Sequence, residues 1–393
     1  MSNFDYTNLF SKTSKNKAPN RHAHARYDFA VAYPDPESLP LDELVQSLQT
    51  ALDREGKDLA YYEDLVGLHG LRALVADKLQ RDRKMDITAE DVVITSGSGE
   101  AISMVIQALT DPGDVIITEK FVYSGTLNQM QRFDADVRAV ECDDTGIDPS
   151  ALETLIQSIQ KENKAIKCLY TIPTFQNPIG WTMPKERREQ IIDICQRHNV
   201  PIFEDDCYFD LRYEGDDVDS FYSMDQKGQT IYVGSFSKII APGMRLGYLI
   251  APEEVRNRAC SFKAGATNPF ASLAVQEYLS NHMYDHIDDQ NSAFRQKRDS
   301  MLSALGESLG SRAEWNVPQG GLYIWVKFPE GTDMEAFQQT CFEEGVGYLN
   351  GKGYSPEGTG ENYVRLCFGH ATVEDCYNGT VEFVRILEKH NII

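Results

Sequence analysis

Residues 230–248, TIYVGSFSKIIAPGMRLGY, join an apolar run to a segment of small and polar residues. The run at 230–236 is rich in β-branched and aromatic residues, which is typical of a buried strand. Lys238 follows this strand directly, and Arg245 lies seven residues further on. Ligands collect beyond the carboxyl ends of parallel strands, so the segment indicates a ligand site if the sheet is parallel.

Runs of the same kind recur along the first two thirds of the chain, with helical spacing between them. They are DVVITSG (91–97), DVIITEK (114–120), AIKCLYTIP (165–173) and VPIFEDD (200–206). PKERREQIIDICQRHN (184–199) is one of the helical segments that separate them. Buried strands alternating with helices predict an α/β fold with a mainly parallel sheet covered by helices on both faces.

The pattern changes after about residue 270, where a long helical tract leads to two further strand-like runs, at 320–329 and 363–369. This change predicts a second, smaller α+β domain. We therefore expect residues 1–40 to form an N-terminal arm and the segment joining the small domain, 41–270 the large cofactor-binding domain, and 271–393 the small C-terminal domain. Within the first part, about twenty residues are expected to be a mobile arm. The prolines of YDFAVAYPDPESLP are expected to prevent regular structure after it.

The chain is strongly acidic, with 60 Asp and Glu against 38 Lys and Arg and a formal net charge of −22. Such a charge repels phosphate backbones, so we expect neither nucleic acid nor an anionic membrane as a partner. An acidic composition of this kind is also favoured by a salty habitat. The sequence shows no apolar run of ~18 residues and no apolar signal core. Eight scattered cysteines without a C-x-x-C pair indicate reduced thiols and a cytoplasmic protein.

Polar segments follow the predicted strand ends: SGSGE (96–100), VYSG (122–125), FQNPIG (175–180), EDDCYFD (204–210) and the Lys238 segment itself. The first opens a helix, so Ser98 and Gly99 can offer backbone N–H groups to a phosphate. Two hydroxyls, from Ser235 and Ser237, and the guanidinium of Arg245 can serve the same anion.

The remaining groups suit an aromatic aldehyde cofactor. Lys238 can form a Schiff base if its amine is deprotonated. Asp205 can pair with a protonated ring nitrogen, while Tyr208 and Asn177 can hydrogen-bond a phenolic oxygen and Tyr123 can stack on the ring. Pyridoxal 5'-phosphate has all of these groups, so we predict it as the cofactor.

The segment S-F-S-K-x-x-A-P-G-x-R-L-G-Y (235–248) resembles the lysine signature of fold-type I pyridoxal-phosphate enzymes of the class I/II aminotransferase family. N-P-x-G at 177–180 and D-x-x-Y at 205–208 match that family in order and spacing. YYEDLVGLHGLRALVADKL, QGGLYIWVKFP and NYVRLCFGH extend the resemblance over nearly the whole chain. VYSGTL is similar to the corresponding segment of the kynurenine/2-aminoadipate transaminase-like subgroup.

The resemblance implies a role for each matching residue. Lys238 is the Schiff-base lysine and proton shuttle, and Asp205 pairs with the ring nitrogen. Asn177 and Tyr208 hold the phenolic oxygen, and Tyr123 stacks on the ring. Phosphate contacts are implied for Ser98, Gly99, Ser235, Ser237 and Arg245.

Three further residues receive roles in the same way. Tyr62 reaches the phosphate of the partner subunit, which implies a homodimer with shared active sites. Arg365 grips the α-carboxylate of the substrate, and Tyr33 lines the substrate site with Asn177. From the residues alone, a structural salt bridge in the small domain remains open for Arg365.

The sequence departs from the family pattern at three places. Val31 and Ala32 stand where a glycine pair is usual, so side chains are expected to narrow the pocket beside Tyr33. Glu100 replaces an amide in the phosphate segment, and Asn350 precedes Gly351 where a proline is usual. These changes affect the expected substrate more than the expected cofactor.

The resemblance implies a pyridoxal-phosphate-dependent aminotransferase that moves an amino group from an α-amino acid to a 2-oxo acid, with 2-oxoglutarate the expected acceptor. Another reaction on the same cofactor (elimination or lysis, oxidation, or carbon–carbon bond formation) is the nearer alternative. The second alternative is a non-catalytic protein, the sensor half of a transcription regulator. Three features argue against this alternative: the presence of Lys238, the acidic charge, and the start of the chain close to the catalytic region. His282 and His286, and the acidic run at 214–219, lack the further ligands of a zinc or calcium site.

Overall fold

The computed structural model describes residues 4–5, 7, 9–10 and 24–393. Within this range, a seven-stranded sheet has the strand order β2-β10-β9-β8-β7-β3-β4. In chain order its strands are β2 (Val92–Thr95), β3 (Val115–Glu119), β4 (Asp136–Val140), β7 (Ile166–Thr171), β8 (Ile202–Asp205), β9 (Thr230–Ser235) and β10 (Gly247–Ile250). The expected mobile arm falls mostly outside the described residues.

The large sheet is mainly parallel, as the sequence predicts. Strands β9, β8, β7, β3 and β4 run in the same direction. Strand β10 runs antiparallel to both of its neighbours, β2 and β9. Strands β4 and β10 were not among the predicted runs, because β4 mixes charged and apolar residues and β10 continues the glycine-containing segment after Lys238.

Both faces of the large sheet are buried. Ile116 of β3 belongs to one hydrophobic cluster, together with Ile102 of the helix that follows β2. The next residue of the strand, Ile117, belongs to a second cluster with Ile156 and Ile191, which lie on two other helices. Alternate residues of one strand therefore enter different cores, which requires helices on both sides of the sheet.

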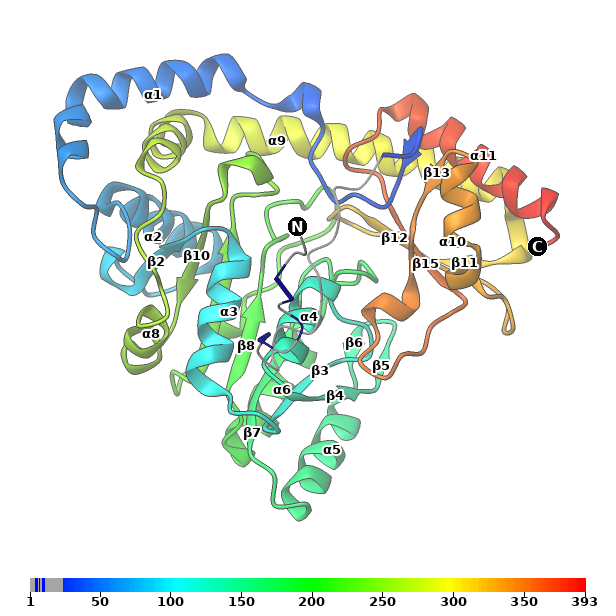
Figure 1. Ribbon diagram of the computed structural model, residues 1–393, viewed down its shortest axis with the longest axis horizontal. Helices are drawn as coiled ribbons and strands as arrows, with labels where there is room; N and C mark the ends of the chain where they lie inside the picture. Colours follow the sequence, from blue (N-terminus) through cyan, green and yellow to red (C-terminus); the bar gives the residue numbers. More distant parts are fainter. Residues whose placement is uncertain (1–3, 6, 8, 11–23) are drawn as a thin grey trace.

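The helices form a layer around this sheet and extend beyond it (Figure 1). They are α1 (Leu41–Glu55), α2 (His69–Arg83), α3 (Ser98–Leu109), α4 (Ser124–Arg132), α5 (Pro149–Lys161), α6 (Lys185–His198), α7 (Phe221–Met224), α8 (Glu253–Cys260), α9 (Pro269–Ser308), α10 (Met334–Glu343) and α11 (Val373–Lys389). Helix α9 packs on α1 and α2 near one end and on α11 near the other, so it joins the two parts of the molecule.

A four-stranded antiparallel sheet, with the order β11-β12-β15-β14, lies beside α10 and α11. Its strands are β11 (Glu314–Trp315), β12 (Tyr323–Lys327), β14 (Leu349–Asn350) and β15 (Tyr363–Cys367). Short strands complete the fold: β5 (Cys142–Asp143) pairs with β6 (Gly146–Ile147), and β1 (Tyr27–Asp28) pairs with β13 (Val346–Gly347). This second sheet agrees with the predicted fold class, while the domain boundaries at residues 40 and 270 stay a prediction.

The expectation that residues 27–40 lack regular structure is wrong at two places. Tyr27 and Asp28 form strand β1, because they precede the first proline and pair with the edge at Val346. A short 3-10 helix spans Pro36–Ser38, where proline occupies a first-turn position that needs no N–H donor.

Two chemical properties hold for the described residues. No helix among them combines the length and the apolar character that a membrane crossing requires. All eight cysteines are free, and five of them are buried.

Candidate functional site

A cleft of about 1670 Å³ opens between the two sheets. Its lining includes Lys238 at the end of β9, Tyr123 at the start of α4, Arg365 of β15 and residues of the 30–33 segment. These positions are far apart in the sequence. They meet because the carboxyl ends of β3, β8 and β9 lie at one edge of the large sheet, and the small sheet faces that edge.

Lys238 lies in the turn after β9 and is largely enclosed. Its Nζ donates a hydrogen bond to the backbone oxygen of Ala32, at 2.8 Å. Burial lowers the pKa of Lys238 below the usual lysine value, and the nearby charges of Arg365 and Arg245 act in the same direction. A lysine with a lowered pKa can present a neutral, nucleophilic amine.

Asp205, the last residue of β8, is buried with one oxygen satisfied and one open. Its Oδ2 accepts a hydrogen bond from the hydroxyl of Tyr170 at 2.6 Å, and that hydroxyl also contacts Thr126 at 3.1 Å. Its Oδ1 has no hydrogen-bond partner among the described residues. Burial raises the pKa of Asp205, and hydrogen bonds from Cys207 and Tyr170 partly offset this effect. An open, buried carboxylate oxygen is suited to a donor supplied by a ligand.

Asn177, Tyr208 and Tyr323 form one hydrogen-bonded group beside the cleft. The amide Nδ2 of Asn177 lies 3.1 Å from the hydroxyl of Tyr208 and 3.3 Å from that of Tyr323. The two hydroxyls are 2.8 Å apart. Tyr323 begins β12 of the small sheet, so this group links the two sheets.

Arg365 lies at the centre of β15 and is almost completely buried. Its guanidinium donates to the backbone oxygen of Ala30, and to Oδ1 of Asn177 at 3.3 Å. Its Nε has no hydrogen-bond partner, and no carboxylate of the described residues pairs with it. The structural salt bridge that the sequence left open is therefore not formed by any described residue, and a buried guanidinium without a counter-ion can bind an anion.

The turn from β2 into α3 is a second candidate anion site. Helix α3 begins at Ser98, and Gly97 precedes it with φ of 80°. A Cβ at Gly97 would lie 2.5 Å from the guanidinium of Arg245, and a Cβ at Gly247 would lie 2.5 Å from the backbone nitrogen of Ser98. Glycine therefore lets the Arg245 side chain and the backbone of β10 approach the start of α3 closely, and free N–H groups at a helix N-terminus favour an anion.

Other predicted phosphate contacts lie around the same turn. Arg245 donates to the backbone oxygen of Ser96 at 2.8 Å, and its own φ of 52° is left-handed. Ser235 and Ser237 are buried, and the Oγ of Ser235 accepts the N–H of Ser237 at 3.1 Å. The carboxylate of Glu100, which the sequence adds here, accepts the N–H of Ser96 at 2.6 Å.

Of the two remaining predicted residues, one lines the cleft and the other lies outside it. Tyr33 lines the cleft and stands edge-on to His370, at 6.0 Å between ring centroids. Tyr62 is fully exposed and lies in a separate groove of about 710 Å³ together with Tyr61 and Thr267. This chain therefore does not bring Tyr62 into the cleft.

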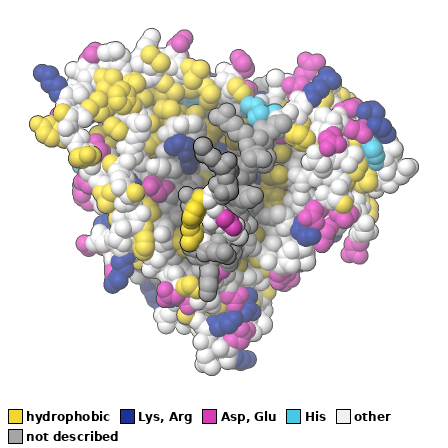
Figure 2. Space-filling view, in the orientation of Figure 1, with side chains coloured by type: hydrophobic (Ala, Val, Ile, Leu, Met, Phe, Trp, Pro, Cys, Tyr) yellow, Lys and Arg dark blue, Asp and Glu magenta, His cyan; other side chains and the backbone are white. Residues whose placement is uncertain are grey.

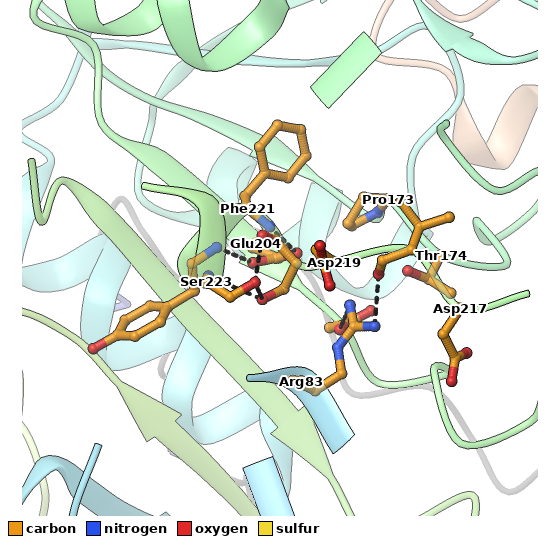
Figure 3. A network of polar contacts seen from close by, with 12 residues as sticks. Arg83, Pro173, Thr174, Glu204, Asp217, Asp219, Phe221 and Ser223 are labelled. Atoms are coloured by element: carbon orange, nitrogen blue, oxygen red, sulfur yellow. Dashed lines mark hydrogen bonds and ion pairs between the residues drawn. The ribbon is translucent and has the colours of Figure 1, made fainter. Parts of the chain in front are cut away.

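A buried charged network supports the strand that carries Asp205. Its neighbours Glu204 and Asp206 point to the opposite face, as the alternation of a strand predicts. Asp206 pairs with Arg83 at 2.7 Å, and Glu204 accepts the N–H of Phe221 at 3.0 Å (Figure 3).

Sequence reasoning missed several residues of the site. Tyr170 and Tyr323 contact predicted residues directly, Thr126 contacts the hydroxyl of Tyr170, and Tyr354 lies against Arg365. Thr126 and Tyr323 lie in the segments VYSGTL and QGGLYIWVKFP, where the resemblance implies no role for them, and Tyr170 and Tyr354 lie in no motif. The partners of Tyr170, Thr126 and Tyr323 are 35 or more residues away, whereas Tyr354 is 11 residues from Arg365. Strand position alone would have placed Tyr170 on the cofactor side of β7.

Comparisons with known proteins agree on one family. The family described as aminotransferase class I and II matches residues 31–378. The aromatic-amino-acid aminotransferase 1 of Thermococcus litoralis is 31% identical over 354 residues, which cover 89% of this chain and 85% of that protein. A helix-turn-helix-type transcriptional regulator of Bacillus subtilis is 32% identical over 322 residues, which cover 81% of this chain and 65% of the regulator.

A solved structure gives the same result. The α-aminoadipate aminotransferase of Thermus thermophilus, in complex with N-(5'-phosphopyridoxyl)-L-leucine, superposes with a TM-score of 0.89 at 25% identity. The match covers 98% of this chain and 99% of that one.

Proposed function

The chain belongs to the class I and II aminotransferase family, and from this premise we propose that it transfers the amino group of an α-amino acid to 2-oxoglutarate. It is a fold-type I, pyridoxal-phosphate-dependent aminotransferase. The acceptor, the roles of individual residues, the homodimer and a cytoplasmic location are parts of the proposal. A reducing compartment is supported by the eight free cysteines.

The open hydrogen-bonding positions of the cleft fit pyridoxal phosphate. Oδ1 of Asp205 is a buried acceptor without a donor, which suits a protonated ring nitrogen. The N-terminus of α3, which Gly97 and Gly247 allow neighbouring segments to approach closely, suits the phosphate. Tyr208 and Asn177 offer a hydroxyl and an amide to the phenolic oxygen.

Bound pyridoxal phosphate supplies an electron sink that labilises a bond to the α-carbon of the substrate. Lys238 is suited to take a proton from the α-carbon and to return it, because burial lowers its pKa. Asp205 remains an acceptor toward the ring nitrogen while Tyr170 fixes its other oxygen. Arg365 orients the α-carboxylate, which places the α-carbon near Lys238.

One observation carries this proposal: Lys238 and Arg365, which has no carboxylate partner among the described residues, line one cleft, and Asp205 with its open oxygen acts electrostatically on Tyr123 of that cleft. The test uses the purified holoenzyme and a panel of L-amino acids, followed by absorbance. An active donor should convert the bound cofactor to its amine form with release of a 2-oxo acid, and 2-oxoglutarate should restore the aldehyde form. Ammonia or peroxide release without the amine form would instead indicate one of the other reactions on this cofactor.

The homodimer is supported by the surface around Tyr62. Exposed apolar side chains gather over α1 and the start of α9 (Figure 2). Exposed apolar residues on these two helices are Leu41, Val45 and Phe270. A contiguous apolar surface of this kind is typical of a protein interface, and Tyr62 lies in the groove beside it.

A further inference from the structure

Two buried tyrosines flank the guanidinium of Arg365. Its central carbon lies 4.7 Å from the ring centroid of Tyr323 and 5.5 Å from that of Tyr354. Tyr323 begins β12, and Tyr354 ends a 3-10 helix at Gly351–Tyr354. Both rings stabilise the cation through their faces, so they hold the guanidinium in position.

The hydroxyl groups of these two tyrosines differ. The hydroxyl of Tyr323 is hydrogen-bonded to Tyr208, at 2.8 Å. The hydroxyl of Tyr354 is buried and donates a hydrogen bond to none of the described residues. The neighbouring Nε of Arg365 is also buried and unpaired. Buried donors without acceptors are rare and destabilising, so this pair calls for an acceptor that a ligand provides.

Tyr354 is fixed from two sides, so its hydroxyl has little freedom to turn toward water. Its backbone oxygen accepts the N–H of Val122 at 2.8 Å, and Val122 directly precedes Tyr123 of the cleft. Its ring packs edge-on against Trp325, at 5.9 Å between centroids.

The charges around this pair select the ligand. The groups that act most strongly on Arg365 are tyrosines and the thiol of Cys367, with no carboxylate among them. Arg365 acts on Tyr354 through its charge and as a side-chain donor to the hydroxyl oxygen, which leaves the O–H of Tyr354 to donate, and Tyr123 and Cys367 act through charge. A cation and a neutral donor that are buried together without a counter-ion favour a single anion with more than one acceptor oxygen.

We propose that the hydroxyl of Tyr354 is a substrate-binding donor that, with Arg365, holds the α-carboxylate of the substrate. This inference rests on the proposed role of Arg365. The proposal adds Tyr354, which lies outside every motif of the sequence, to the substrate site. Tyr323 flanks the same cation but uses its hydroxyl on Tyr208, so the two tyrosines serve different ligand groups.

The test measures binding of 3-phenylpropanoate, which has a carboxylate but no amino group, to the holoenzyme by calorimetry. The variants are Tyr354→Phe, Tyr323→Phe and Arg365→Lys. Tyr278→Phe is the matched control, because the hydroxyl of Tyr278 bonds only His286, on the same long helix. Tyr354→Phe should weaken carboxylate binding about tenfold, Tyr323→Phe by much less, and Tyr278→Phe not at all.

A second measurement separates binding from structural support. Because Tyr354→Phe removes a buried hydroxyl whose O–H lacks an acceptor, the melting temperature of the ligand-free holoenzyme should stay the same or rise. A lowered melting temperature with unchanged carboxylate affinity would assign Tyr354 a structural role and overturn the proposal.

The Arg365→Lys variant tests the proposed role of Arg365 separately from the proposed role of Tyr354. Weaker binding in Arg365→Lys but not in Tyr354→Phe refutes the role of Tyr354 alone. Unchanged binding in both variants refutes the role of Arg365 as well. Failure of Tyr354→Phe to fold would likewise assign the hydroxyl a structural role and overturn the proposal.

Discussion

Asp205 and Asp206 are adjacent residues of one type, yet they lie in opposite environments. Asp205 faces the cleft with an open oxygen, whereas Asp206 is paired with Arg83 on the far side of the sheet. The alternation of a strand is the physical reason, since successive side chains leave it on opposite faces. The chemistry of this site is therefore set by single positions.

Substitution of the two aspartates should affect turnover and stability differently. Asp205→Asn should lower kcat by several orders of magnitude with little loss of stability, because the ring nitrogen loses its anionic partner. Asp206→Asn should keep more activity but lower the free energy of unfolding by about 3 kcal/mol, because Arg83 stays buried without its counter-ion. Turnover and urea denaturation measured on both variants check this, and the reverse pattern would contradict the roles proposed for the two residues.

Lys238 should be the residue that carries the covalent cofactor. After borohydride reduction and denaturation, mass spectrometry should find a pyridoxyl group on the unmodified chain and none on Lys238→Ala. Lys263→Met is the control, because Lys263 is also buried with a lowered pKa but donates to the backbone oxygen of Leu65.

The pH dependence of cofactor loading follows from the same lysine. Burial lowers the pKa of Lys238, so the neutral amine that reacts with an aldehyde forms at a lower pH than in an ordinary lysine. The rate of cofactor uptake should rise with pH and level off below the ordinary lysine pKa of about 10.4. A rate that still rises above that value would contradict the lowered pKa.

At the scale of elements, the carboxyl ends of β3 and β7 are held by one buried side chain. Glu119, at the end of β3, accepts the hydroxyl of Thr171 at 2.6 Å and the N–H of Ile172 at 2.9 Å. Burial raises the pKa of Glu119 to about 7. Folding therefore favours the protonated carboxyl of Glu119, and its ionisation at higher pH destabilises the contact between β3 and β7.

This carboxyl should make stability depend on pH. The pKa of Glu119 in the folded chain lies above its unfolded value, so its contribution is complete below about pH 4.5 and is lost as the pH rises through about 7. Glu119→Gln cannot ionise, so the variant should gain on the order of 3 kcal/mol relative to the unmodified enzyme between pH 5 and pH 8. Denaturant unfolding over this range checks it, and parallel curves for the two proteins would contradict it.

The whole molecule brings its site together from segments that are far apart in the chain. Arg365 of the small sheet reaches Ala30 near the N-terminal side and Asn177 of the large domain. Helix α9 connects the two sheets and fixes the cleft between them. In the proposed homodimer, the exposed Tyr62 of a second copy completes the phosphate site.

Shared sites should show complementation. Lys238→Ala and Tyr62→Ala chains should each be weakly active, and mixing them after dissociation should restore part of the activity in hybrid dimers. Sedimentation should give a dimer for the unmodified chain. A fully active monomer would contradict the shared site, and Val317→Ala in place of Tyr62→Ala serves as the control because Val317 is exposed between β11 and β12.

Local sequence was sufficient for the α/β fold and for the segments that hold the cofactor. A strand followed by a glycine-containing turn and a helix, as at 92–109, is encoded by adjacent residues, so periodicity and motif spacing predict it. The same holds for the position of Lys238 after β9 and of Asp205 at the end of β8. The short strands β1, β4 and β10 escaped prediction because pairing with a neighbour, rather than local pattern, defines them.

Tertiary structure alone decided which side chains surround the predicted ones. Tyr170 was placed against Asp205 and Arg83 against Asp206 by packing between segments that are remote in sequence, and Tyr354 meets Arg365 across the loop between a 3-10 helix and β15. The open positions, such as Oδ1 of Asp205 and the hydroxyl of Tyr354, are also invisible in the sequence. A hydrogen bond depends on distance and direction in space, and local spacing fixes neither between distant segments.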